Sequence, residues 1–298
     1  MDVSIIIVNY NTRELISNCI RSIFEKTTEI DYEIIVVDNA SNDGSQQMIT
    51  DKFPKVKLIE FTENIGFGRA NNRGVKIAKG KYLFFLNSDT ELKNNSVKFF
   101  FDFMEQYNTK ENIGAVGSLL LDIEGNPIHS SGSFLKPLND IFFIIKKYIN
   151  PNIKKKERKF FDQNENSFYV DYITGADLFI PRHVFDKLNG FDEIFFMYCE
   201  ETDLQLRMKK QNLRRLIIKG PEIIHFEGSS FNYIKKKSNL RRILIDTSHF
   251  IYFKKNCSLL SYYLYRILFV FARFLTIVDN SYTLNERIYY LKNLIKKV

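Results

Sequence analysis

The sequence has no tryptophan and is poor in cysteine, histidine and proline. Its 298 residues include 3 cysteines, 4 histidines and 6 prolines. Cys19, Cys199 and Cys257 are odd in number and lack the spacing of a metal site, so they give no disulfide framework and favour a reducing compartment. No basic segment followed by a long apolar core precedes the first expected strand, and we therefore expect no signal peptide. Together these absences favour a cytoplasmic protein.

Acidic residues are also in the minority. The chain has 43 Lys and Arg against 35 Asp and Glu, and its formal net charge is +8. Such a charge points to an anionic partner, which could be nucleotide phosphates, nucleic acid or an acidic membrane surface. Nucleic acid is disfavoured, because no combination of basic and aromatic residues matches a known binding module. Beyond Lys235 the only acids are Asp246, Asp279 and Glu286, which suggests a domain boundary near that residue.

Short apolar runs alternate with helical patterns over the first part of the chain. With 45% hydrophobic residues, the chain has ample material for a folded core. The expected strands are Ile5–Val8, Glu33–Val37, Val56–Phe61 and Tyr82–Leu86, with a helix expected between successive strands. This alternation predicts an α/β fold with a doubly wound, mostly parallel sheet that has helices on both faces.

Polar side chains end the most apolar of these strands. The apolar and aromatic residues at 82–86 stop abruptly at Asn87-Ser88-Asp89. Ligands bind at the carboxyl ends of strands in open α/β sheets, and an Asp there with an Asn two residues earlier suits a hard divalent cation. A turn is the simpler interpretation, because Asn, Ser and Asp are also turn residues.

A second acid, Asp38, follows the strand at 33–37. In a βαβ unit such an acid can hydrogen-bond a ribose hydroxyl or a base edge. Dinucleotide binding would also require a glycine-rich turn after the first strand, and the residues there, Asn9-Tyr10-Asn11-Thr12, include no glycine. A nucleotidyltransferase of the sugar-nucleotide pyrophosphorylase type would need a glycine- and arginine-rich loop at the same place. Both classes are therefore disfavoured.

Glycines gather in the segment 63–74. Gly66 and Gly68 lie around the expected start of a helix, where backbone N–H groups can face an anion. Arg69 or Arg73 could add charge-assisted hydrogen bonds. A helix start with glycines around it is also common where no ligand binds.

Acidic residues gather once more in the second half of the chain. Glu200, Glu201 and Asp203 lie near an expected helix start, where they could simply complement the helix dipole. Asp203 and Arg207 are four residues apart and could pair, whereas Glu201 points elsewhere and is freer to act as a general base toward a hydroxyl. His225 follows an apolar pair, and a lone histidine is more often structural than a ligand.

Seven stretches of the chain, taken in order, carry a family resemblance. They are Ile5–Asn11, Val37–Ser45, Glu63–Gly74, Leu86–Thr90, Thr174–Ala176, Gly190–Tyr198 and Glu200–Leu204. As an ordered set they resemble family 2 glycosyltransferases of the GT-A fold, in particular bacterial rhamnosyltransferase-type members. The resemblance spans about Ser4 to Phe231.

The resemblance implies an inverting glycosyltransferase with a nucleotide-diphosphate-sugar donor, either dTDP-rhamnose or a UDP-sugar. Asp38 would hold the nucleoside, with Asn9, Asn11 and Asn64 lining the base and ribose. The full set of nucleotide-sugar-binding residues that it implies is Asn9, Asn11, Asp38, Asn39, Asn64, Gly66, Phe67, Asn71, Asn87 and Ser88.

The resemblance also implies a divalent cation, Mn²⁺ or Mg²⁺, which would bridge the diphosphate and offset the charge of the leaving group. Asp89 would bind it with His225 at a second metal-side position, while Asn87 stands where the family usually has an acid. Glu201 would be the base that deprotonates the acceptor hydroxyl. It stands where family members usually carry Asp, and Glu200 is an alternative base. The implied acceptor-side residues are Gly175, Ala176 and Asp203.

We expect two domains. Residues 1–235 would form the GT-A glycosyltransferase domain, with a nucleotide-binding half at 1–95 and an acceptor-side half at 96–235. The second half contains a basic, aromatic excursion at 134–168, which could be a functional lid or a solvated run of charge. Residues 236–298 would form a basic, amphipathic helical tail.

Part of this tail, Leu259–Val278, is about as long as a membrane span, but Arg266 and Arg273 interrupt it. The two arginines are seven residues apart and share one helix face, with aromatic residues around them. Two interpretations remain open. The helix could lie in a membrane interface, or it could pack on the rest of the protein.

These inferences lead us to expect a cytoplasmic glycosyltransferase, peripheral on the inner face of the plasma membrane. It would extend a cell-envelope polysaccharide or a lipid-linked oligosaccharide, and a homodimer is left open. One alternative is a subunit that binds sugar nucleotides, or acts as a scaffold, without catalysis. A nucleotidyltransferase is a less favoured alternative.

Overall fold

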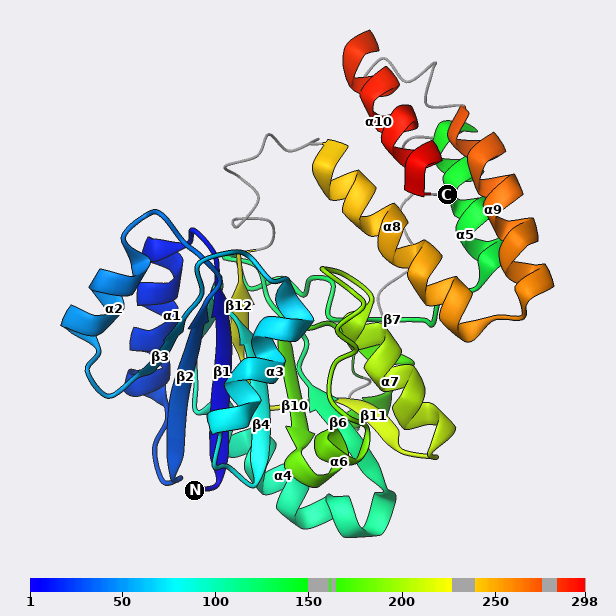
Figure 1. The fold of residues 1–298 in the computed structure, drawn as a ribbon. Helices are drawn as coiled ribbons and strands as arrows, with labels where there is room; N and C mark the ends of the chain where they lie inside the picture. The colour runs from blue at the N-terminus through cyan, green and yellow to red at the C-terminus, as the bar shows by residue number, and fades with distance from the viewer. Residues whose placement is uncertain (150–160, 162–164, 227–238, 275–282, 298) are drawn as a thin grey trace. The chain divides into compact units, whose positions relative to one another are not determined.

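The computed structural model describes residues 1–149, 161, 165–226, 239–274 and 283–297. The chain divides into two compact units. Unit 1 is residues 1–133, 160–196 and 200–233, and unit 2 is residues 134–159, 197–199 and 234–298. All strands of the described residues belong to unit 1, whereas unit 2 is helical (Figure 1).

An eight-stranded sheet forms the centre of unit 1, in the order β3-β2-β1-β4-β10-β6-β11-β8 (Figure 1). Its strands are β1 (Val3–Asn9), β2 (Tyr32–Asp38), β3 (Lys57–Glu60), β4 (Tyr82–Asn87), β6 (Ile113–Gly117), β8 (Ser167–Tyr169), β10 (Asp177–Pro181) and β11 (Arg214–Ile218). The first four strands in this order run parallel. β10 is antiparallel to both of its neighbours, β6 and β11 are parallel, and β8 is antiparallel to β11. The predicted α/β fold with a mostly parallel sheet is confirmed.

Helices cover both faces of this sheet. They are α1 (Arg13–Lys26), α2 (Ser45–Lys52), α3 (Phe67–Ile77), α4 (Ser96–Glu111), α6 (Arg182–Lys187) and α7 (Glu200–Lys210). Along β1, Ile5 and Ile7 join a buried cluster with side chains of α1 and α4, while Ile6 joins a second cluster with side chains of α3 and α7. Successive residues of a strand point to opposite faces, so a strand covered on both sides is one continuous apolar run.

Two short sheets complete unit 1. β5 (Thr90–Leu92) pairs antiparallel with β12 (Ile223–His225), so that His225 lies opposite Thr90. β7 (Ser131–Gly132) pairs antiparallel with β9 (Tyr172–Ile173). The first of these pairings brings the residues that follow β4 next to a segment far later in the sequence.

Unit 2 contains α5 (Pro137–Ile149), α8 (Asn239–Asn256), α9 (Leu259–Phe274) and α10 (Leu284–Lys297). Its core is aromatic, and rings of Phe250, Phe253, Tyr265 and Phe269 lie in contact. α5 comes from the excursion expected at 134–168. This part of the excursion is a helix that packs against α9, and its function as a lid stays a prediction. The basic residues at 154–156 lie outside the described residues.

The helical pattern predicted for the tail is confirmed by α8, α9 and α10. In α9, Arg266 lies over the rings of Tyr262 and Tyr263, while Arg273 forms an ion pair with Asp246 of α8 at 2.5 Å. α9 therefore packs against other helices of unit 2, which is one of the two interpretations of the sequence. Its contact with a membrane remains a prediction. Within the described ranges, no helix is both long enough and apolar enough to cross a membrane.

Candidate active site

The carboxyl ends of β1, β2 and β4 meet at one edge of the sheet. In the strand register Asn9 lies beside Asp38, and Val8 lies beside Asn87. Predicted nucleotide-sugar-binding residues from three separate segments are therefore neighbours. This is the edge at which open α/β sheets bind their ligands.

Asp38 is fully buried and is held by three donors of unit 1. Its carboxylate accepts hydrogen bonds from Asn9 Nδ2 at 2.7 Å, from the Ser41 N–H at 2.8 Å and from Gln46 Nε2 at 2.7 Å. These bonds shape the loop between β2 and α2. Because a carboxylate accepts about four hydrogen bonds, little of this group is left for a nucleoside. The assignment of Asp38 to the nucleoside stays a prediction.

Asn11 and Ser88 are tied to the loops around them. Asn11 has a left-handed backbone (φ +53°), and its Oδ1 accepts from the Asn42 N–H at 2.8 Å. Thr12 Oγ1 lies within hydrogen-bond distance of both Asn9 Oδ1 (2.6 Å) and Ser88 Oγ (2.9 Å). Thr12 thereby links the end of β1 to the end of β4, a role that sequence patterns did not reveal.

An asparagine network joins the end of β2 to the start of α3. Asn39 Nδ2 donates to Asn64 Oδ1 at 2.9 Å, and Asn39 Oδ1 accepts from the Ile65 N–H at 2.9 Å. Asn64 Oδ1 also accepts from the Gly66 N–H at 3.0 Å. The predicted residues Asn39, Asn64 and Gly66 are thus brought together.

Gly66 lets the segment before α7 approach the start of α3 closely. Its φ is +90°, and a Cβ at this position would lie 2.3 Å from the carbonyl oxygen of Phe196. The same oxygen accepts from the Phe67 N–H at 2.9 Å. Asn72 adds a hydrogen bond from its Nδ2 to the Phe191 carbonyl oxygen at 2.8 Å. The Phe67 N–H therefore holds this loop and the Gly66 N–H is bonded to Asn64, so neither is directed at an anion.

Two predicted site residues support helices of unit 1. Asn71 is 1% exposed, and its Nδ2 donates to the Phe67 carbonyl oxygen inside α3 at 3.1 Å. Asp203 is fully buried and pairs with Arg207 Nε at 2.9 Å, which confirms the predicted pair. Arg207 also donates to the Gly190 carbonyl oxygen at 2.8 Å. The contacts named here hold α3, α7 and the loop at Gly190.

The start of α7 lies against the start of α3 and against Gly175. A Cβ at Gly68 would lie 3.4 Å from Glu200 Cβ. A Cβ at Gly175 would lie 3.4 Å from Phe67 Cε1 and 3.9 Å from Glu201 Cβ. Motifs predicted for the donor side and for the acceptor side therefore meet around the two glutamates.

Glu200 and Glu201 form a pair of poorly solvated carboxylates. The Oε2 atom of each is buried and has no hydrogen-bond partner among the described residues. Burial, together with the neighbouring charge of Glu201, raises the pKa of Glu200 well above its usual value, and burial raises the pKa of Glu201. Glu201 is the less buried of the two residues. A raised pKa makes a carboxylate a stronger base, which suits proton abstraction from a hydroxyl.

Asp89 and His225 are brought together by the β5–β12 pairing. His225 Nε2 lies 3.2 Å from Asp89 Oδ1 and 3.4 Å from Asn87 Nδ2. The backbone supports this arrangement, since the Phe226 N–H donates to the Asp89 carbonyl oxygen at 2.9 Å. The two predicted metal residues, Asp89 and His225, therefore lie together, next to the predicted nucleotide-sugar-binding residue Asn87.

The chemistry of this group fits a divalent cation that completes its coordination with ligands from outside the protein. A carboxylate oxygen and an imidazole nitrogen both bind Mn²⁺, and Mg²⁺ commonly combines one or two carboxylates with phosphate oxygens of a substrate. Over the described part of the chain, no three His, Cys, Asp or Glu side chains are grouped so that they could hold a metal. Protein side chains alone would leave such an ion incompletely coordinated.

Gln205 is a site residue that sequence reasoning missed. This side chain is fully buried in α7, donates from Nε2 to the Ile173 carbonyl oxygen at 2.7 Å and accepts from the Ile173 N–H at 2.8 Å. It therefore fastens α7 to β9, next to Gly175. A signal was present, because Gln205 follows Glu201 by one helical turn.

Asp177 is a second missed residue. Its Oδ2 accepts from both the N–H and the hydroxyl of Ser118 at 2.6 Å, while its Oδ1 is buried without a hydrogen-bond partner in the described residues. Burial raises the pKa of Asp177 to about 7. An acid directly after Gly175-Ala176, inside an otherwise apolar strand, is the signal that could have found it.

Two solved structures share this fold. The mannosyltransferase PcManGT from Pyrobaculum calidifontis, in complex with GDP-Man and Mn²⁺, is similar with a TM-score of 0.56 over 99% of this chain and 73% of that protein, at 16% identity. GalNAc-T7, solved with UDP, GalNAc and Mn²⁺, is similar with a TM-score of 0.56. The match covers 76% of this chain and 44% of the GalNAc-T7 chain, also at 16% identity. These similarities identify the fold as the GT-A type.

Sequence comparison identifies the family. The family model "Glycosyl transferase family 2" matches residues 4–179. An N-acetylglucosaminyl-diphospho-decaprenol L-rhamnosyltransferase of Mycobacterium tuberculosis is 24% identical over 218 residues, which are 68% of this chain and 69% of the relative. Rhamnosyltransferase WbbL of Escherichia coli K12 is 27% identical over 232 residues, 75% of this chain and 83% of the relative. The chain belongs to glycosyltransferase family 2, as predicted, and is a glycosyltransferase.

The contact at Gly66 gives a first testable prediction. Gly66→Ala is expected to lower the free energy of unfolding by about 2–6 kcal/mol, because an alanine at φ +90° and ψ 167° costs about 1–3 kcal/mol and overpacking adds about 1–3 kcal/mol. Gly125→Ala is the matched control, since Gly125 also has a positive φ (+84°) but an added Cβ would meet nothing within 4 Å. Urea denaturation measures both changes. Equal losses for the two variants would contradict the close approach of Phe196.

The buried carboxyl of Asp177 gives a second prediction. Its folded pKa of about 7 lies above the value of 3.8 for an ordinary Asp, so the folded state holds a proton that the unfolded state has lost between these pH values. Stability from this group is therefore present at low pH and is lost as pH rises through 7.

Asp177→Asn should remove this dependence, because the amide oxygen can still accept from Ser118 and nothing ionises. The variant is expected to be more stable than the parent above pH 8, by up to about 4 kcal/mol for a shift of about three pKa units, and close to it at pH 4. Urea denaturation across pH measures the difference. A difference that does not change with pH would show that Asp177 is ionised throughout in the folded protein.

Proposed function

We propose that this chain is an inverting glycosyltransferase that moves a sugar from dTDP-rhamnose or a UDP-sugar to a hydroxyl of a cell-envelope polysaccharide or a lipid-linked oligosaccharide. The observation that carries the proposal is the pair Glu200 and Glu201, which packs against both the glycine segment of α3 and Gly175. A basic group is thereby available where the donor-side and acceptor-side motifs meet. The two relatives named above are rhamnosyltransferases, and the mycobacterial one is named for a decaprenol-linked substrate, which supports rhamnose and a lipid-linked acceptor.

The donor would bind at the carboxyl ends of β1, β2 and β4. Asn9, Asp38, Asn39 and Asn64 supply the amide and carboxylate groups that a base and a ribose require. Several of these groups hydrogen-bond one another, so donor binding would exchange some of these contacts for contacts with the nucleotide. Asn87 and Ser88 would face the sugar diphosphate.

Asp89 and His225 would hold Mn²⁺ or Mg²⁺. When bound, the cation supplies positive charge that stabilises the diphosphate as it leaves. Asp89 provides a carboxylate oxygen and His225 an imidazole nitrogen. Asn87, at 3.4 Å from His225, places a neutral amide where the family usually has an acid. The protein thus contributes less negative charge here, and the site would depend more on the phosphate oxygens of the donor.

Glu201 or Glu200 would take the proton of the acceptor hydroxyl. As the O–H bond breaks, the hydroxyl oxygen forms a bond to the anomeric carbon, and the bond from this carbon to the diphosphate oxygen breaks with its electron pair going to the diphosphate. Such a single displacement inverts the configuration at the anomeric carbon. Gln205 would position the base by fixing α7 against β9.

The acceptor would approach from the side of Gly175, Ala176 and Asp203. Gly175 borders Glu201, and the Ala176 carbonyl oxygen accepts from the Asn87 N–H at 3.0 Å, which links this motif to the end of β4. We assign donor binding to residues 1–95 and acceptor binding to 96–235. The protein would work in the cytoplasm, on the inner face of the plasma membrane.

The base assignment is tested by the pH dependence of transfer. Glu201→Gln keeps the size of the side chain but cannot accept the proton, so transfer should fall by about 10²–10⁴-fold if Glu201 is the base. Glu200→Gln should then remain active with an unchanged acid limb in its kcat/KM profile, because burial, and not the charge of Glu200, raises the pKa of Glu201. Glu124→Gln, in an exposed turn, is the matched control.

Loss of transfer in Glu200→Gln alone would move the role to Glu200. Unchanged transfer in both variants would contradict the proposal for α7. Nucleotide binding without transfer by the parent protein would favour a non-catalytic, sugar-nucleotide-binding subunit.

The metal assignment is tested on Asp89. Asp89→Ala should raise the Mn²⁺ concentration needed for half-maximal thermal stabilisation in the presence of the nucleoside diphosphate by about 10-fold or more, because the carboxylate ligand is lost. Asp102→Ala, which removes an exposed carboxylate of α4, should leave this concentration unchanged. Transfer by the parent protein that persists in a chelator would remove the cation from the proposal.

A further inference from the structure

In unit 2, α9 has two apolar faces. One face packs within the unit and includes the buried rings of Tyr265 and Phe269. The other face is exposed and consists of Leu259, Leu260, Tyr263, Leu264, Ile267 and Phe271. These residues recur every three or four positions, so they form one continuous stripe along the helix. Leu260 is 81% exposed and Phe271 is 69% exposed, values that a buried helix face would not have.

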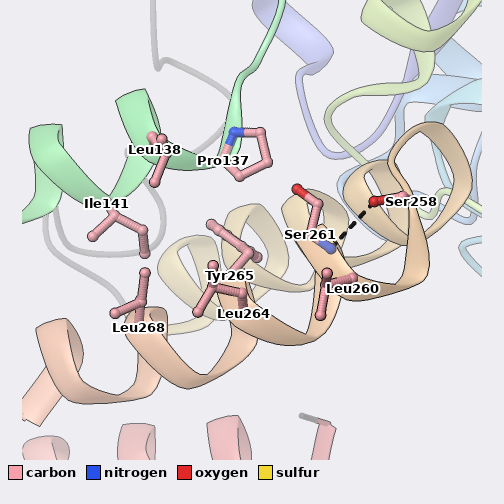
Figure 2. A pocket seen from close by; sticks show the side chains of 9 residues that line it. All are labelled: Pro137, Leu138, Ile141, Ser258, Leu260, Ser261, Leu264, Tyr265 and Leu268. Carbon is pink, nitrogen blue, oxygen red and sulfur yellow. Dashed lines mark hydrogen bonds between the residues drawn. The ribbon is translucent and has the colours of Figure 1, made fainter.

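α5 extends this apolar surface. Leu138, Phe142 and Ile145 are exposed and are spaced four and three residues apart, so they also share one face. Because α5 packs against α9, a groove runs between the helices, with Leu138 of α5 and Leu264 of α9 on its walls (Figure 2). We name the exposed residues of both helices the α5–α9 face.

The charge of unit 2 is opposite to that of the rest of the chain. Unit 2 contains 21 Lys and Arg and 5 Asp and Glu, a net charge of +16, whereas the remaining residues contain 22 and 30, a net charge of −8. Cations also lie beside the exposed aromatic rings. Lys146 Nζ is 5.7 Å from the centre of the Phe142 ring, and the Arg266 guanidinium is 5.7 Å from that of Tyr263.

We propose that the α5–α9 face docks on a bilayer surface that contains anionic phospholipids. The exposed leucines and aromatic side chains would enter the boundary between headgroups and acyl chains, and the cations beside them would bind lipid phosphates. A second copy of this chain is a poor occupant, because two units of charge +16 repel each other. This docking goes beyond the proposed reaction and does not depend on it.

Vesicle sedimentation of the full chain tests the proposal. The parent should bind vesicles of phosphatidylglycerol and phosphatidylcholine, bind phosphatidylcholine vesicles more weakly, and lose affinity as salt is raised, since screening weakens attraction to charged lipid. The double variant Leu260→Glu/Leu264→Glu should bind the anionic vesicles at least about 10-fold more weakly, because burial of a single leucine already accounts for a change of about that size.

The control replaces two exposed isoleucines of unit 1, in the variant Ile77→Glu/Ile123→Glu. It adds the same charge and should bind like the parent. Circular dichroism and nucleotide-dependent thermal stabilisation report whether the fold and the donor site are intact, so a failure of docking is distinguishable from a failure of the proposed function. Equal binding by the two double variants would overturn the proposal, as would a lipid-free dimer that only Leu260→Glu/Leu264→Glu dissociates.

Discussion

The close approach of the chain at Gly66 is the constraint on which the rest of the site depends. Gly66 has a φ of +90°, and a Cβ at this position would lie only 2.3 Å from the Phe196 carbonyl oxygen. Only glycine, which has no Cβ, fits there. This contact holds the segment before α7 against the start of α3. Glu200 and Glu201 then reach Gly68 and Gly175, although these glycines belong to distant parts of the sequence. The site is thus assembled by backbone packing before any ligand is involved.

Much of the fold followed from local patterns. The segments 5–8 of β1, 34–37 of β2 and 82–86 of β4 have no polar interruption because these strands are covered on both faces, and their parallel order follows from the helices between them. The antiparallel insertion of β10 between β4 and β6 did not follow, since its pairing depends on contacts far apart in sequence. α5 was also missed. Its apolar residues lie both on the side that packs against α9 and on the exposed side, so the sequence shows no helical period of apolar residues there.

The sequence predicted where the candidate site residues lie in the fold better than it predicted which contacts their side chains make. Asp38 and Asn87 end the two strands on either side of β1, and they lie at one edge because parallel strands share a carboxyl edge. The hydrogen bonds that engage Asp38, and the turn of Asn71 back into α3, depend on tertiary contacts that no spacing encodes. Asp89 and His225 meet only because β5 pairs with β12. In unit 2 likewise, the basic composition was evident from the sequence, whereas the α5–α9 face depends on tertiary packing and was not.

In the proposed reaction, one glutamate of α7 deprotonates the acceptor for a single displacement on the donor sugar. The anomeric configuration of the product measures this most directly, with the nucleotide-diphosphate sugar, Mn²⁺ and a lipid-linked oligosaccharide as substrates and NMR of the new linkage as the readout. A single displacement gives a product whose anomeric configuration is the opposite of that in the donor. A product that retains the configuration of the donor would contradict it.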